Sequence, residues 1–232
     1  MLSKLSISML RRLVVTGFIV GLMLTPVITR AISPGSEPNP FTPILDFVEK
    51  HYAEITKDTG NPWHSFIFII KPNTQYVENV AVLNINGVSG DTLEEFTNDV
   101  RNDVFWFPGV TNVVRTQGNG RTGTVYQETL NFGGVTFTDD VVVAGFVGNK
   151  WMIQNSINGP VNSSGILFWN NTLKGGRFAL YGLVPIPQGT SLPDFKAQLS
   201  QANFAAMNNL MAHFNTTGTI TYSDSVITTP NF

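Results

Sequence analysis

The middle of the chain, from 77 to 187, consists of short apolar stretches separated by turn-forming residues. In several of these stretches apolar and polar residues alternate, which is the pattern of a strand with one buried face. Glycine pairs and Gly-Asn dipeptides between the stretches are typical of hairpin turns. The pattern predicts a first strand at 77–88 and then a meander of about six antiparallel strands, at 110–116, 124–132, 135–146, 150–157, 165–173 and 177–187.

Apolar residues follow helical spacing in three segments. The first, 44–55, is short and amphipathic, and its apolar face needs a surface to pack on. The second, 91–102, begins at Asp91, which can cap the helix. The third, 191–214, begins at Ser191, a favourable N-cap residue. Because an α-helix rises about 1.5 Å per residue, this last helix is long enough to cross a whole sheet.

The first 31 residues have the character of a removable secretion signal. Arg11 and Arg12 precede an apolar stretch from Leu13 to Ile28, and Ala31 provides a small residue at the expected cleavage point. The alternative is a retained membrane anchor. A span needs about 20 apolar residues, however, and Pro26 interrupts this run. We therefore expect a secreted or periplasmic protein with no stable membrane span once the signal is removed.

The remaining chain divides into three parts. Residues 32–74 form a proline-rich linker and then an accessory region with the first helix and a strand at 63–70. Residues 75–214 contain the predicted sheet and the long helix, and form the main domain. Residues 215–232 are polar and rich in threonine, which predicts a C-terminal tail.

Composition narrows the chemistry that is open to the mature chain. Cleavage removes four of the 14 Lys and Arg residues and none of the 16 Asp and Glu residues, which leaves a net charge of −6. Nucleic acid is not expected as a partner, because its binding depends on basic side chains. The chain has no cysteine, which excludes disulfides, thiolate catalysis and cysteine-based metal sites. The three histidines lie far apart without metal-ligand spacing, so neither a metal nor a cofactor is expected.

The order of these elements resembles the START-like superfamily, the helix-grip proteins that include polyketide cyclases and lipid-transfer domains. The local similarities are the aromatic turn Phe105–Val110 before the second strand and the hairpin Gly165–Pro187. The resemblance covers about residues 77–214. It implies an α+β helix-grip fold, in which a curved antiparallel sheet of six to seven strands wraps around the long C-terminal helix and leaves a cavity between them. The accessory helix and strand lie outside this unit.

A cavity of this kind would hold an apolar small molecule. Aromatic and methionine side chains on the predicted sheet and helix suit such a pocket, and ordinary core packing is the alternative for each of them. The residues expected to bind the ligand are Trp106, Phe107, Tyr126, Trp151, Trp169, Tyr181, Phe204, Met207 and Met211.

Acidic residues on the predicted sheet keep an enzymatic alternative open. The candidates are Glu128, Asp139 and Asp140. Because neighbouring side chains on a strand point to opposite faces, at most one of the two aspartates can be buried. The G-x-G-x-x-G at 118–123 precedes a strand rather than a helix, which indicates a hairpin and not a nucleotide site. The sequence contains no G-x-S-x-G serine motif.

We therefore expect an exported, non-enzymatic binding or transport protein for an apolar, lipid-like or polycyclic molecule, held between the sheet and the C-terminal helix. One alternative is a polyketide cyclase/dehydrase-like enzyme, which requires an inward-facing, desolvated carboxyl group beside a cavity. The other is a structural or interaction module, which requires a filled core. The sequence identifies no protein partner.

Overall fold

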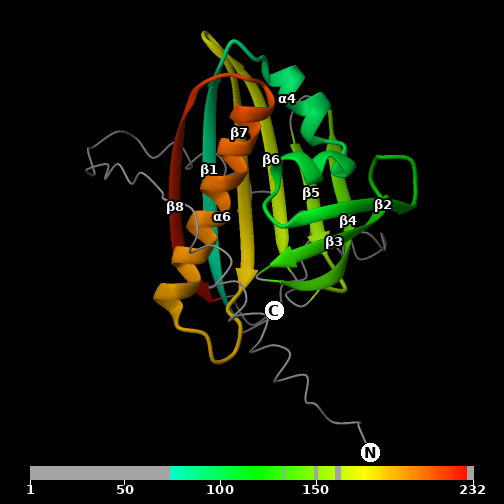
Figure 1. Ribbon diagram of the computed structural model, residues 1–232, viewed down its shortest axis with the longest axis vertical. Helices are drawn as coiled ribbons and strands as arrows, with labels where there is room; N and C mark the ends of the chain where they lie inside the picture. The colour runs from blue at the N-terminus through cyan, green and yellow to red at the C-terminus, as the bar shows by residue number, and fades with distance from the viewer. Residues whose placement is uncertain (1–73, 133, 149–150, 160–162, 229–232) are drawn as a thin grey trace, which may run out of the picture.

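The computed structural model describes residues 74–132, 134–148, 151–159 and 163–228 (Figure 1). The predicted signal at 1–31, the linker, the helix at 44–55 and the strand at 63–70 lie outside the described residues. None of the helices within the described ranges is long and apolar enough to span a membrane.

The described residues form one eight-stranded antiparallel sheet in the order β2-β3-β4-β5-β6-β7-β1-β8. The meander from β2 to β7 is therefore completed by β1 and β8, which come from the two ends of the described chain. This confirms the α+β helix-grip architecture, with eight strands instead of the six to seven expected. The strands are β1 (Gln75–Asn86), β2 (Val110–Gln117), β3 (Val125–Phe132), β4 (Val135–Val147), β5 (Trp151–Ser156), β6 (Ser164–Thr172), β7 (Gly175–Pro185) and β8 (Gly218–Thr228).

Strand β8 corrects the prediction of a polar tail at 215–232. The strand pairs with β1 along its whole length, and its residues mostly alternate between half-buried and exposed. Thr219 and Thr221 are exposed on one face of the strand, and Ile220 and Tyr222 lie half-buried on the other. By pairing with β1, β8 covers an edge that would otherwise be open to other chains.

Three short helical segments connect β1 to β2: α4 (Gly90–Thr97), the 3₁₀ helix η1 (Val100–Asn102) and α5 (Asp103–Trp106). They replace the single helix predicted at 91–102. Helix α4 is capped by Ser89 rather than Asp91, and the Ser89 hydroxyl accepts a hydrogen bond from the Thr92 N–H (3.0 Å). A second cap at Asp99 starts η1. Because each cap satisfies free backbone N–H groups, the chain can bend between them and bring α5 against the long helix.

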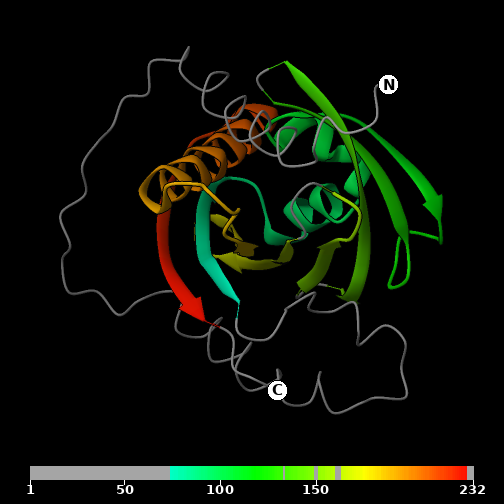
Figure 2. The ribbon, with the colours of Figure 1, turned by 90° about the horizontal axis from the view of Figure 1, so that it is seen from below.

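The long helix α6 (Leu192–His213) lies on the concave side of the sheet (Figure 1). Seen from below, the sheet bends around the helices (Figure 2). Helix α6 packs against β1, β8 and α5. Its residues Ala206, Met207 and Leu210 are fully buried against the sheet. The predicted arrangement of a curved sheet around the last helix is thus confirmed.

Two apolar clusters lie on opposite faces of the sheet, as the alternation of buried residues along β1 requires. The inner cluster joins sheet and helices and includes Trp106, Phe178 and Met207. The outer cluster has only strand residues among its buried members: Tyr76, Val80, Val82, Ala144, Ile153, Ile166, Ala179, Tyr181 and Leu183.

Candidate functional site

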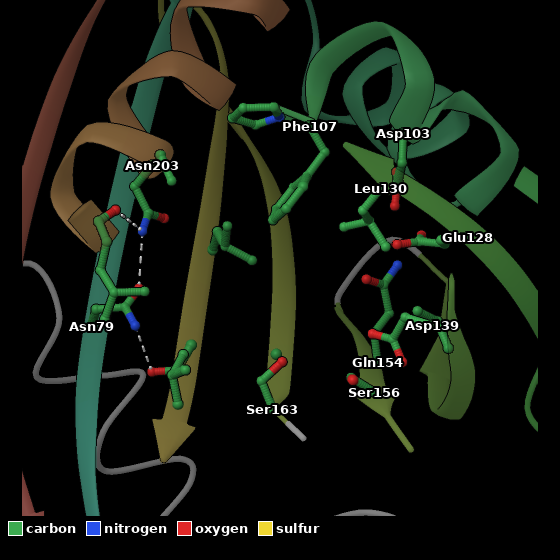
Figure 3. A pocket seen from close by; sticks show the side chains of 18 of the residues that line it. Asn79, Asp103, Phe107, Glu128, Leu130, Asp139, Gln154, Ser156, Ser163 and Asn203 are labelled. Carbon is green, nitrogen blue, oxygen red and sulfur yellow. Dashed lines mark hydrogen bonds between the residues drawn. The ribbon is translucent and has the colours of Figure 1, made fainter. Parts of the chain in front are cut away.

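The inner face of the sheet and α6 do not close completely, and the space between them is a cavity of about 300 Å³ (Figure 3). Helix α6 provides one wall, and α5 and the strands provide the others. Most of the lining side chains are apolar: Trp106, Phe107, Pro108, Leu130, Phe137, Val141, Leu180, Val184, Pro187, Phe195, Leu199 and Ala202.

Two glycines on paired strands keep the floor of the cavity open. Gly165 of β6 and Gly182 of β7 lie directly opposite each other, and both line the cavity. A Cβ added to Gly165 would meet no atom nearer than 3.6 Å, which is ordinary van der Waals contact, so a methyl group fits at this residue without a clash. A Cβ added to Gly182 would come within 2.9 Å of the Asn79 side chain. The middle of the sheet therefore lacks two side chains that would otherwise fill the space under α6.

Three carboxyl groups from three elements meet at one end of the cavity: Asp103 of α5, Glu128 of β3 and Asp139 of β4 (Figure 3). Glu128 and Asp139 are direct cross-strand partners. Asp103 and Glu128 are only 4% and 6% exposed, and each carboxyl group is close enough to shift the pKa of the other. We call these three residues the carboxyl end of the cavity.

The surroundings of the carboxyl end favour protonated carboxyl groups. Burial, with the charge of Asp139 as a second cause, raises the pKa of Glu128 to about 7. Burial also raises the pKa of Asp139 to about 6, against the opposing effect of a hydrogen bond from Ser156. Burial and the neighbouring Glu128 raise the pKa of Asp103 well above its ordinary value. Burial is the largest cause for each of the three groups, so this end of the cavity disfavours the charged form of all three carboxyl groups.

Several buried polar atoms at this end have no hydrogen-bond partner within the part of the chain that the structure describes: Asp103 Oδ1, Trp106 Nε1, Asp139 Oδ1 and Gln154 Nε2. The indole N–H of Trp106 is close enough to Asp103 to lower the pKa of that carboxyl slightly, but it does not reach hydrogen-bond geometry. A buried polar atom without a partner costs about 1–3 kcal/mol. These atoms therefore make the carboxyl end an energetically unfavourable part of the described structure.

A pair of amides lies on the opposite side of the cavity (Figure 3). Asn203 of α6 donates hydrogen bonds to Asn79 Oδ1 of β1 (3.1 Å) and to the Leu199 carbonyl (2.8 Å). Asn79 donates in turn to the Gly182 carbonyl (3.2 Å). Asn203 Oδ1 has no partner. The cavity thus has apolar walls with polar groups at two sides.

The structure distributes the nine residues predicted to bind a ligand over several environments. Trp106 and Phe107 lie in the cavity wall. Tyr126, Trp169 and Met207 are buried in the inner cluster and are not among the lining residues. These three side chains therefore fit the alternative interpretation, in which they are ordinary core residues.

The other four predicted residues also lie away from the cavity wall. Tyr181 belongs to the outer cluster and Trp151 packs against it. Met211 is half-buried beside the inner cluster, and Phe204 is exposed on α6. The cavity lies under the first half of α6, because the second half fills the space between itself and the sheet. The α6 residues that line the cavity are Phe195, Gln198, Leu199, Ala202 and Asn203.

Of the acidic candidates, Glu128 and Asp139 line the cavity. Asp140 does not line it; its carboxylate accepts hydrogen bonds from Asn158 (2.7 Å) and Gln127 (3.4 Å). Sequence reasoning missed Asp103, because a carboxyl in a short helix gives no periodic signal. It also missed Asn203, although a polar residue within an apolar helical stripe was a signal that could have been used.

The glycine-rich stretch at 118–123 connects β2 to β3, as predicted for a hairpin. The Gly120 N–H donates a hydrogen bond to Thr124 Oγ1 (2.8 Å), which stabilises the turn. Among the residues that the structure describes, no group of His, Asp and Glu is arranged to hold a metal ion.

No family model matches the sequence, and no curated protein is significantly similar to it. Solved structures do match. A START superfamily protein from Mycobacterium smegmatis superposes with a TM-score of 0.51 at 10% identity, over 60% of this chain and 97% of that protein. Major latex-like protein 151 from Panax ginseng gives 0.47 at 9% identity, over 60% and 97% of the two chains. Ara h 8.0201 gives 0.45 at 17% identity, over 59% and 99%.

The match to the mycobacterial protein agrees with the sheet order and with the position of α6. The chain has the START-like, helix-grip fold. At 10% identity this likeness defines the fold, and the ligand and the activity have to be argued from the cavity itself.

Proposed function

We propose that this protein binds a small, largely apolar molecule in the cavity between the sheet and α6. The observation that carries the proposal is an unfilled core: mostly apolar side chains surround about 300 Å³ of space above two opposed glycines. Apolar walls with a few polar groups are the usual form of a ligand pocket. The same observation argues against a structural module, which requires a filled core.

The volume of the cavity limits the class of ligand. Ligand pockets commonly measure about 300–1,000 Å³, so this cavity lies at the small end of the range. Its size favours a compact polycyclic or short-chain molecule over a lipid with two long acyl chains. The polar groups at two sides favour a ligand with polar atoms at its ends.

We also propose that the protein acts outside the cytoplasm, in the periplasm or after secretion. The support is the signal-like sequence of residues 1–31. Mass spectrometry of the intact protein from its own host tests this proposal. The expected mass is that of a chain that begins near residue 32, and a chain that still carries the first 31 residues contradicts it.

The binding function is tested by native mass spectrometry of the protein from its own host, before and after extraction with organic solvent. We expect an additional mass that the solvent removes. A size series at Gly165 provides the matched control, because leucine would fill the cavity whereas alanine adds one methyl group without a clash. Gly165→Leu should lose the bound compound and Gly165→Ala should keep it. A wild-type protein that carries nothing and takes up no added apolar compound contradicts the proposal.

A second candidate function is acid–base catalysis on the bound molecule. The specific observation is that Glu128 and Asp139 face the cavity, where burial raises the pKa of each carboxyl, to about 7 and about 6. A carboxyl with a pKa near the working pH can both accept and donate a proton. Perturbed carboxyl groups in a cavity are more frequent at active sites than elsewhere.

Exchange of carbon-bound hydrogen tests this second function without knowledge of the natural substrate. In D₂O, a general base removes the proton next to the carbonyl of a bicyclic ketone such as 2-tetralone, and a deuteron then returns to the carbon. No other reagent is consumed. If the protein is an enzyme of this kind, it accelerates deuterium incorporation seen by NMR, and Glu128→Gln removes the acceleration while Asp140→Asn retains it. Exchange at the buffer rate indicates a carrier without this activity.

A further inference from the structure

The carboxyl end has no positively charged partner within the cavity. Asp103, Glu128 and Asp139 lie together there, and none of the described residues that line the cavity is Lys, Arg or His. A buried charge without a partner is unfavourable by several kcal/mol, on the order of the cost of breaking a buried ion pair. Hydrogen bonds to Asp139 reduce this cost in part, and protons on the carboxyl groups reduce it further. A positive charge on the ligand would remove the cost directly.

We propose that the carboxyl end binds a cationic nitrogen, as in a protonated amine, while the apolar body of the same molecule fills the rest of the cavity. This inference rests on the proposed binding function and narrows its ligand class to amphiphilic amines.

The unpaired atoms of the carboxyl end supply the acceptors that an ammonium group needs. Asp103 Oδ1 and Asp139 Oδ1 have no hydrogen-bond partner among the described residues. The Asp103 side chain is 4% exposed and lines the cavity, so its free oxygen is shielded from bulk solvent. The Gln154 amide also lines the cavity with an unpaired nitrogen, and a half-turn of the amide presents its oxygen instead. Three acceptors match the three N–H donors of an ammonium group.

The remaining walls fit the apolar part of such a ligand. Phe107 and Leu130 line the space beside the carboxyl end, with Phe107 lying between that end and Asn203 (Figure 3). A ring system attached to the amine would contact these side chains and extend toward the amide pair. An anionic ligand in the same position would be repelled by the carboxylates. A neutral alcohol would gain hydrogen bonds but no charge neutralisation.

Three naphthalene probes of equal size test the charge preference: 2-naphthylmethylamine, 2-naphthylmethanol and 2-naphthoate. Their binding to the solvent-stripped wild-type chain is measured by isothermal titration calorimetry at pH 7.5. We expect the amine to bind at least about tenfold more tightly than the alcohol, which corresponds to about 1.4 kcal/mol. We expect the carboxylate to bind more weakly than either.

Amide variants test whether the preference for the amine over the alcohol arises from the carboxyl groups of the cavity. Glu128→Gln and Asp139→Asn should each reduce the affinity for the amine toward that for the alcohol. Asp140→Asn, one residue along β4 and outside the cavity, removes a charge that also acts on Asp139, so it should weaken amine binding much less than the two cavity variants do. The alcohol also reports whether each variant is folded, because a folded cavity still takes the neutral probe.

The results separate this inference from the binding function. If the amine and the alcohol bind equally well, the protein is a binding protein and the cationic subsite is refuted. The same conclusion follows if Asp140→Asn weakens amine binding as much as the cavity variants do. If none of the three probes binds, both the binding function and the subsite fail.

Discussion

Glu128 and Asp139 lie opposite each other on the paired strands β3 and β4, and both side chains line the cavity. Like charges at directly opposed positions of a sheet are unfavourable. Burial makes the repulsion between the two charges more unfavourable. Burial and the charge of Asp139 together raise the pKa of Glu128 to about 7. An arrangement that opposes stability at one place in an otherwise well-packed sheet is typical of a functional site.

The raised pKa of Glu128 predicts a specific dependence of stability on pH. Folding raises this pKa from an ordinary value of 4.5 to about 7. Between these values the folded state binds more protons than the unfolded state, so the free energy of unfolding falls as the pH rises through this window. Glu128→Gln should remove part of this fall and stabilise the protein at pH 8 by up to about 3 kcal/mol.

Urea denaturation at pH 4.5 and pH 8 measures this effect. Asp103 and Asp139, which face Glu128 from α5 and β4, also have raised pKa values, so some decline with pH should remain in the variant. Asp140→Asn, outside the cavity, should change the pH dependence much less than Glu128→Gln does, because its charge is a smaller cause of the raised Asp139 pKa than burial is. Equal pH dependence in wild type and Glu128→Gln would contradict the proposed desolvation of this carboxyl.

The two opposed glycines should respond differently to the same substitution. Gly182→Ala places a Cβ at 2.9 Å from the Asn79 amide, which disturbs the hydrogen bond between Asn79 and Asn203. We expect a loss of about 1–3 kcal/mol in the free energy of unfolding. Gly165→Ala meets no atom within 3.6 Å and should change stability little. Thermal unfolding of the two variants compares them directly, and equal losses would show that the space above Gly165 is not open.

A buried hydrogen bond between α4 and β6 provides a test of the helix placement. The Trp169 indole N–H donates to Thr97 Oγ1 (2.6 Å), whose hydroxyl donates to the Leu93 carbonyl (2.7 Å). Thr97→Val keeps the shape but leaves the indole N–H without a partner, so stability should fall by about 1–3 kcal/mol. Thr97→Ser retains the hydroxyl and should lose less. Denaturant titration distinguishes the two, and a valine variant no less stable than the serine variant would contradict the contact.

Removal of β8 should be far more damaging than removal of a polar tail. A chain that ends at 214 exposes the edge of β1, which pairs with β8 along its whole length, and loses the Lys196–Asp224 ion pair. We expect a cooperative loss of stability and a tendency to aggregate through the open edge. A chain that ends at 228 is the control and should behave like wild type. Size-exclusion chromatography and thermal unfolding give the readout; wild-type behaviour of the shorter chain would mean that β8 is dispensable.

Local sequence pattern was sufficient to predict most of the fold. Alternating residues and turn glycines identified the meander, and the apolar stripe identified α6, because both patterns depend on residues close in sequence. The same pattern placed Glu128 and Asp139 on the predicted sheet as candidate acid–base residues. Two local errors came from capping and composition. Caps at Ser89 and Asp99 divide the helix predicted at 91–102. The polar threonines at 215–232 suggested a tail, so the strand β8 was not predicted.

The residues that line the cavity were much harder to predict. Among the nine proposed ligand contacts, Trp106 and Phe107 lie in its wall. The large side chains Met207 and Trp169 instead fill the core beside it. A large apolar side chain is equally suited to a filled core and to a cavity wall, so residue type alone does not separate the two.

The sequence by itself determined the antiparallel meander, the long amphipathic helix and the absence of thiol chemistry, since each is a property of composition or of short-range spacing. Only the tertiary structure decided where α6 crosses the sheet, that the cavity lies under its first half, and that Asp103 joins Glu128 and Asp139 there. The reason is physical: the shape of an unfilled space depends on how elements distant in sequence pack against one another. The periodicity of any single element does not record that packing.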